Sequence, residues 1–181
     1  MSLFQNKYRI ETAHLKDYDY SSEGDYYVTI CTNNKQNIFG FVEDKRMVLN
    51  PAGIAAAEHW KHLPEDFKNI TLGDFVIMPD HMHGIIRINK KTVKTLHNMI
   101  RVFKSKSGIQ INRINGTQGS KPWQTGFYDR VIRGEIEYFF VTEYILNNPL
   151  VYEFGKEGKE WYELFEERNN QQNKQNNNET A

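Results

Sequence analysis

Two histidines, His81 and His83, are separated by a single residue within an isoleucine-rich stretch of the chain. Side chains at positions i and i+2 of a β-strand point to the same face of a sheet. Two imidazoles at this spacing can therefore share one metal ion while Met82 faces the core. The spacing alone is weak evidence, because such pairs are more often ordinary surface or core histidines. No cysteine or nearby carboxylate cluster completes a tetrahedral zinc site, so a third ligand has to come from elsewhere in the chain.

Tyr144 and Asn148 are candidates for a nucleophile and a further ligand. Residues four apart share a face of a helix, so these two side chains lie together if the segment is helical. A tyrosine can attack a phosphate that is held by a metal ion. The amide oxygen of Asn148 suits a hard cation such as Mg²⁺ or Mn²⁺. Considered alone, with ten tyrosines in the chain, the segment is more simply explained by a core tyrosine and a helix-ending asparagine.

Basic residues are concentrated between positions 84 and 134. This segment has eleven lysines and arginines and one acidic residue, a net charge of +10 in a chain whose formal total is zero. Such segregation is typical of phosphate binding. A solvated helix face followed by a charged loop is the alternative, less favoured explanation. The candidate nucleic-acid contacts are the helical cations Arg101, Lys104 and Lys106, which would bind phosphates, and the group Trp123, Tyr128, Arg130 and Arg133, whose aromatic members would stack on unpaired bases.

The 181 residues suffice for one domain with a sizeable core, and 39% of them are hydrophobic. The single cysteine, Cys31, excludes an internal disulfide framework and favours the reducing cytoplasm. No apolar run is long enough for a membrane span, so we expect no membrane partner. The predicted organisation is an N-terminal extension packing on the domain (1–24), a single domain (25–168) and a disordered Asn/Gln-rich tail (169–181).

The hydrophobic pattern predicts an α+β fold. Strands are expected at 26–32, 70–78, 82–88 and 127–132, and helices at 50–62, 92–106 and 135–147, with a flexible glycine-rich loop at 108–119. Ile54, Ala55, Ala57 and Trp60 are expected to form the buried stripe of the first helix, and Pro149 to stop the last one. The order β-α-β-β-α-β followed by a helix predicts a ferredoxin-like or RRM-like sandwich, an antiparallel sheet with helices mainly on one face.

Together these motifs resemble the REP-associated tyrosine transposases, which belong to the single-tyrosine HUH endonucleases and share the insertion-sequence-type transposase fold. The resemblance covers about residues 25–150. It rests on the stretch from Gly73 to Ile86 that contains His-Met-His, on Phe103-Lys104-Ser105, on the stretch from Trp123 to Arg133, and on Tyr144-Ile-Leu-Asn-Asn-Pro. Relatives often have asparagine where this chain has Asp80, which leaves the role of that carboxylate open.

The resemblance implies nicking and rejoining of single-stranded DNA at a hairpin through a 5′-phosphotyrosine intermediate. Tyr144 would be the nucleophile, and His81, His83 and Asn148 would bind Mg²⁺ or Mn²⁺. The partner would be single-stranded or hairpin DNA, and the protein a monomer or a homodimer. Two alternatives remain at this stage. The chain could be a non-catalytic nucleic-acid-binding module on the same fold, or a replication initiator or relaxase with the same histidine pair.

Overall fold

The computed structural model describes residues 3–4, 7–8 and 14–154. The predicted tail (169–181), the end of the predicted domain (155–168) and part of the predicted extension lie outside the described residues. The elements in chain order are β1 (Leu3–Phe4), β2 (Lys7–Tyr8), β3 (Gly24–Cys31), a 3₁₀ turn (Asn33–Lys35), β4 (Gly40–Glu43), β5 (Arg46–Leu49), α1 (Pro51–Lys61), α2 (Leu63–Asp66), β6 (Ile70–Ile77), β7 (His81–Ile88), α3 (Leu96–Asn115), β8 (Tyr128–Ile132), α4 (Glu135–Leu146) and α5 (Asn148–Phe154).

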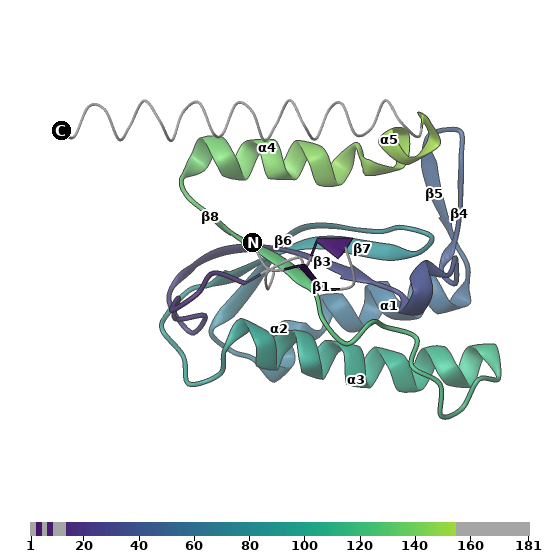
Figure 1. The fold of residues 1–181 in the computed structure, drawn as a ribbon, viewed down its shortest axis with the longest axis horizontal. Helices are drawn as coiled ribbons and strands as arrows, with labels where there is room; N and C mark the ends of the chain where they lie inside the picture. The colour runs from purple at the N-terminus through teal and green to yellow at the C-terminus, as the bar shows by residue number, and fades with distance from the viewer. Residues whose placement is uncertain (1–2, 5–6, 9–13, 155–181) are drawn as a thin grey trace.

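The central sheet has four antiparallel strands in the order β6-β7-β3-β8. Its two middle strands pair along eight residues each, from Gly24 opposite Ile88 to Cys31 opposite His81. Helices α1, α2 and α3 cover one face of the sheet, and α4 and α5 lie over the other (Figure 1). The predicted ferredoxin-like α+β sandwich is confirmed, with α4 and α5 as the exception to helices on one face.

The main core lies between the sheet and helices α1 and α3. Strand β7 contributes Met82, which is fully buried, and α1 contributes Trp60. Gly84 allows these elements to pack closely, because a Cβ at this position would lie 2.6 Å from Cζ2 of Trp60. The opposite face of the sheet has a smaller core, formed with α4 by Ile85, Ile132, Val141 and Ile145. Alternation along β7 therefore places His81 and His83 on the face that α4 covers.

Helix α1 begins as its sequence predicts, but its buried side differs. The side chain of Asn50 caps the helix by accepting a hydrogen bond of 2.9 Å from the backbone N–H of Gly53. The prediction that Ile54 is buried was wrong, because its side chain is 50% exposed. The fully buried positions are Ala52, Ala56 and Trp60, which follow one another at four-residue spacing and define the inner face.

The predicted flexible loop at 108–119 was also wrong, because α3 continues to Asn115. Gly108 and Ile111 are buried and extend the apolar face of this helix. The helix ends at Gly116, whose φ of +66° is the left-handed conformation that glycine adopts most easily. The glycines thus mark one packed helix position and one helix end.

Two further features depart from the predicted elements. The hairpin of β4 and β5, which precedes α1, was not predicted. Pro149 does follow the end of α4, yet it also lies in the first turn of α5, where proline is tolerated because it lacks only an N–H that is unpaired there. The described part of the predicted extension contacts the domain through Tyr20, which is 6% exposed, and through a hydrogen bond between His14 and Asp129.

Candidate metal and nucleophile site

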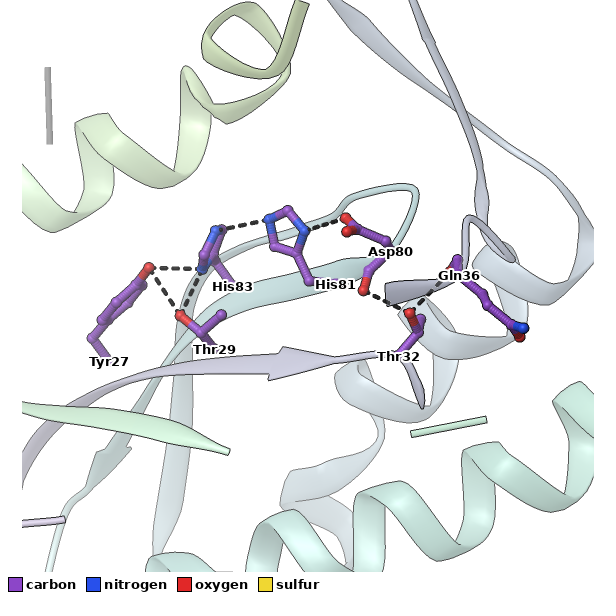
Figure 2. A network of polar contacts seen from close by, with 7 residues as sticks. All are labelled: Tyr27, Thr29, Thr32, Gln36, Asp80, His81 and His83. Atoms are coloured by element: carbon purple, nitrogen blue, oxygen red, sulfur yellow. Dashed lines mark hydrogen bonds and ion pairs between the residues drawn. The ribbon is translucent and has the colours of Figure 1, made fainter. Parts of the chain in front are cut away.

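The two histidines of β7 converge on one point. The Nε2 atoms of His81 and His83 are 3.1 Å apart, and the rings lie at 72° to each other (Figure 2). His83 is 4% exposed, and the side chain of His81 is 19% exposed. Met82 points into the main core, as the alternation predicts. The pair thus presents two ring nitrogens side by side on the face covered by α4.

The other ring nitrogen of each histidine, Nδ1, is hydrogen-bonded to neighbouring side chains. Nδ1 of His81 is 2.6 Å from Oδ1 of Asp80. Nδ1 of His83 is 2.7 Å from the hydroxyl of Tyr27 and 2.9 Å from Oγ1 of Thr29 (Figure 2). Contacts of this kind fix the orientation and tautomer of metal-binding histidines, because they leave Nε2 as the free donor atom. Asp80 therefore has a definite place as the hydrogen-bond partner of His81.

The electrostatics of the pair favour a neutral His83 and an ionised Asp80. Burial, followed by the nearby charge of His81, holds the pKa of His83 well below its usual range. A neutral imidazole is the form that binds a metal ion. Burial by itself would raise the pKa of Asp80, but the hydrogen bond and charge of His81, a backbone hydrogen bond and Lys35 together lower it below its usual value.

Tyr144 lies over the histidines near the end of α4. Its ring centre is 5.2 Å from that of His83 and 6.3 Å from that of Tyr27. Burial raises the pKa of the Tyr144 phenol, and a hydrogen bond with the side chain of Asn148 opposes this shift only in part. Asn148 is 3% exposed. The two residues predicted to share a helix face are therefore in contact, although Asn148 begins α5 instead of ending α4.

The donor atoms fit a divalent cation bound by two imidazoles. Two ligands on adjacent corners of an octahedron, each about 2.1 Å from the ion, lie about 3.0 Å apart. The observed separation of the two Nε2 atoms is 3.1 Å. Within the described residues no group of three or more His, Cys, Asp or Glu side chains could hold a metal. The remaining positions would fall to an amide, water or a substrate oxygen.

The helical cations predicted to bind phosphate differ in their surroundings. Arg101 is exposed on α3. Nζ of Lys104 donates to the backbone carbonyls of Gln124 at 2.8 Å and Gly126 at 2.6 Å. Nζ of Lys106 lies 2.6 Å from a carboxylate oxygen of Asp66. Arg101 is thus open to a ligand, whereas the two lysines already have partners within the chain.

Trp123 is placed in the core. It is 5% exposed, and its Nε1 donates a 3.0 Å hydrogen bond to Oγ of Ser107. Its ring packs between Phe39 and Phe103, with ring centres 4.9 Å and 5.4 Å away. This packing leaves no open ring face on which an unpaired base could stack.

The predicted contacts on β8 lie nearer the surface. Tyr128 is 46% exposed. Nε of Arg130 donates to a carboxylate oxygen of Glu137 at 2.6 Å, and Arg133 is exposed just after the strand. Within this group, Tyr128 and Arg133 have the most open side chains.

Two site residues were not predicted from the sequence, Tyr27 and Thr29. They are two apart on β3 and share a face, and the pairing of Thr29 with His83 brings them beside the histidines. The sequence does contain the alternation of β3. The register between β3 and β7, which decides what that face meets, could not be predicted from either segment alone.

Comparisons with known proteins show the family of the chain and proteins of similar fold. The family described as "Transposase IS200 like" matches residues 20–148. An uncharacterized protein of Haemophilus influenzae is 34% identical over 159 residues, which are 77% of this chain and 87% of that protein. A solved REP-associated tyrosine transposase bound to a REP hairpin superposes with a TM-score of 0.58 at 19% identity, covering 79% of this chain and 76% of that one. A putative transposase of Deinococcus radiodurans gives a TM-score of 0.47 at 12% identity, with 74% and 95% covered.

Proposed function

The chain belongs to the IS200-like transposase family, and from that premise we propose that it nicks and rejoins single-stranded DNA through a covalent bond to Tyr144. The observation that carries the proposal is the convergence of three side chains. The Nε2 atoms of His81 and His83 are 3.1 Å apart, and the ring of Tyr144 lies 5.2 Å from that of His83. A non-catalytic DNA-binding module would have no use for this arrangement.

The proposed reaction is a transesterification at phosphorus. The phenol oxygen of Tyr144 bonds to the scissile phosphorus, and the bond from phosphorus to the 3′ oxygen breaks. The phenol gives up its proton, and the departing 3′ oxygen gains one. The products are a 5′-phosphotyrosine and a free 3′-hydroxyl, so the bond energy is kept for rejoining by the reverse step.

The chain supplies positioning for this step. The residues that would hold Mg²⁺ or Mn²⁺ are His81, His83 and Asn148, and the cation would polarise the phosphate. Hydrogen bonds between Nδ1 of His83 and the side chains of Tyr27 and Thr29 hold the ring so that its Nε2 faces Nε2 of His81. Because burial raises the pKa of Tyr144, the resting phenol is protonated at neutral pH.

The proposed substrate is a DNA hairpin with a single-stranded flank. One solved protein of the same fold is bound to a REP hairpin, and the segment 84–134 carries the net charge of +10. Arg101 and Arg133 would contact phosphates, since both side chains are exposed. Tyr128, which is 46% exposed, would stack on a base.

Substitution of Tyr144 tests the proposal. Hairpin oligonucleotides with single-stranded flanks, designed on inverted repeats sought in the DNA beside the gene, are labelled 3′ of the expected nick and incubated with the protein and Mn²⁺, then separated by denaturing electrophoresis. We expect Tyr144→Phe to lose the covalent adduct while keeping the fold and the affinity for the hairpin. Tyr128→Phe and Tyr138→Phe also remove one hydroxyl but keep the aromatic ring that could contact DNA, so both controls should keep the adduct. An adduct formed by Tyr144→Phe would refute the assignment of the nucleophile.

A further inference from the structure

A pocket of about 390 Å³ opens between α4 and the sheet. Its lining includes Asp25, Asp74, Arg87, Tyr138, Phe139 and Thr142. Arg87 follows His83 by four residues on the same face of β7, which corresponds to about 13 Å along the strand. The pocket therefore lies on the same face of the sheet and under the same helix as Tyr144, toward the opposite end of β7.

One wall of the pocket is an ion pair that is already satisfied. Nε and Nη2 of Arg87 donate to the two carboxylate oxygens of Asp25 at 2.6 Å and 2.8 Å. The guanidinium also lies 5.4 Å from the ring centre of Tyr138. Both oxygens of Asp25 accept from Arg87, so this wall is preformed, and the pair uses two of the five N–H groups of the guanidinium.

Asp74 differs, because it presents an open acceptor. It lies at the irregularity of β6 between Leu72 and Phe75, where the pairing with β7 shifts register. Oδ2 accepts a long hydrogen bond of 3.3 Å from Oγ1 of Thr142. In the part of the chain that the structure describes, no donor is assigned to Oδ1 of Asp74. A ligand in the pocket would meet a carboxylate that can accept two parallel hydrogen bonds.

Phe139 gives the pocket a surface on which a flat ring can stack. Its side chain is 58% exposed and belongs to the pocket lining. Tyr138, next to it on α4, can approach the sheet because residue 73 is glycine: a Cβ there would lie 2.6 Å from the Tyr138 hydroxyl. Gly134 and the carboxylate of Glu135 also belong to the lining, and the exposed Arg133 immediately precedes them in the chain, so a cation and an anion are neighbours near the rim.

We propose that this pocket binds an unpaired guanine of the DNA strand whose phosphate lies at Tyr144. The carboxylate of Asp74 would accept from N1–H and the N2 amine of the base, and Phe139 would stack on it. Guanine is the base that offers two adjacent donors on its pairing edge. Adenine and cytosine place a ring acceptor beside their amine, and thymine places carbonyls on both sides of its single donor, so each of them would repel one carboxylate oxygen.

The inference rests on the proposed DNA substrate and specifies what part of it is read. The separation of about 13 Å from the histidines is short enough for one unpaired strand to reach both the pocket and Tyr144 within a few nucleotides. The guanine would therefore lie a few nucleotides from the nick, in the single-stranded flank. The pocket would select the site, while the histidines and Tyr144 act on the phosphate.

Binding to short oligonucleotides tests the inference without requiring a nick. The probes are fluorescein-labelled ten-nucleotide oligo(dT) strands with either two central deoxyguanosines or two deoxyinosines, which keep N1–H but lack the N2 amine. We expect the wild-type protein to bind the guanine probe about 10-fold more tightly. Asp74→Asn should reduce this ratio to near one. Phe139→Ala should weaken both probes and leave the ratio unchanged.

Asp44→Asn is the matched control, because Asp44 is an exposed aspartate in the β4–β5 turn, and asparagine tolerates its positive φ of 47°. It should bind both probes as the wild type does. Equal wild-type affinities for the two probes, or an unchanged ratio in Asp74→Asn, would overturn the inference. A covalent adduct without guanine preference would refute the pocket and leave the nicking proposal standing. Guanine preference without a covalent adduct would support the pocket and refute the nicking proposal.

Discussion

Removing the hydroxyl of Tyr27 tests whether the partners of His83 set its affinity for metal. Tyr27→Phe deletes the oxygen that lies 2.7 Å from Nδ1 of His83. The ring remains, so its stacking on His83 at 5.5 Å and its edge contact with Tyr144 at 6.3 Å are kept. The change is therefore confined to one hydrogen bond at Nδ1 of His83, the ring nitrogen that does not face His81.

The expected effect follows from what is left after the substitution. Loss of such a supporting hydrogen bond weakens metal binding by about 10- to 100-fold. Oγ1 of Thr29 still lies 2.9 Å from Nδ1 in the variant, so we expect the lower figure, about 10-fold. Adding Thr29→Val should bring the loss toward about 100-fold, because Nδ1 of the buried His83 then has neither of these partners.

The assay is a titration of adduct formation with Mn²⁺, which gives the half-saturating concentration separately from the rate at saturation. Calorimetry gives Mn²⁺ binding directly, without DNA. Tyr26→Phe is the matched control, since Tyr26 precedes Tyr27 on β3, faces the main core and donates a 2.8 Å hydrogen bond to the carbonyl of Ser22. Both variants should lose about 1 kcal/mol of stability, and only Tyr27→Phe should shift the Mn²⁺ midpoint.

Two outcomes would refute this reasoning. An unchanged midpoint in Tyr27→Phe would mean that Nδ1 of His83 needs no support from Tyr27. A lower rate at saturating Mn²⁺ with an unchanged midpoint would mean that Tyr27 acts on the phosphate or on Tyr144. Its ring lies close enough to Tyr144 for the second outcome to be a real alternative.

Two further predictions concern the basic segment. Arg101→Ala should reduce the slope of log Kd for a hairpin against log salt concentration by about 0.7 to 0.9 between 50 and 200 mM, which corresponds to one phosphate contact. Lys106→Ala should reduce the slope less, because Lys106 is paired with Asp66. Anisotropy titrations that give equal slopes for the two variants would contradict this difference. Burial lowers the pKa of Lys104 to about 8, while the unfolded lysine titrates near ~10.4. The unfolded chain then binds more protons between those values, so the free energy of unfolding should rise from about pH 8 to about pH 10.4 and Lys104→Met should lack that rise. Urea denaturation across this range checks the prediction, and a wild-type profile no steeper than that of the variant would show that the carbonyl acceptors of Lys104 offset its burial.

Local periodicity predicted much of the fold and part of the site. Two histidines at i and i+2 share a face in any strand, so the pairing of His81 with His83 required no knowledge of the rest of the molecule. Contact between Tyr144 and Asn148 was likewise predicted from helical spacing. The contact between Tyr144 and Asn148 is kept although α4 ends between them, because α5 begins at Asn148.

Contacts between distant segments account for what the sequence could not predict. Tyr27 meets His83 through a strand register that neither segment encodes alone. Trp123 was expected to stack on bases because arginines follow it, but Ser107 and Phe39, far away in the sequence, enclose it. Lys106 was likewise expected to bind phosphate because it belongs to the basic segment, whereas in the fold a carboxylate oxygen of Asp66 lies 2.6 Å from its Nζ. Composition reports how many groups exist, and only packing decides which of them remain open to a ligand.

Helix α4 connects the proposed chemistry to the proposed base recognition. Its first half lines the guanine pocket through Tyr138 and Phe139, and its last turn carries Tyr144. Val141 and Ile145 of the same helix pack in one cluster with Ile85, which lies between His83 and Arg87 on β7. A helix fixed in this way keeps its two ends at a constant separation, so in the proposed complex the position of the guanine would also set which phosphate reaches Tyr144. In this arrangement, the base that is read and the bond that is cut are related by the length of one helix.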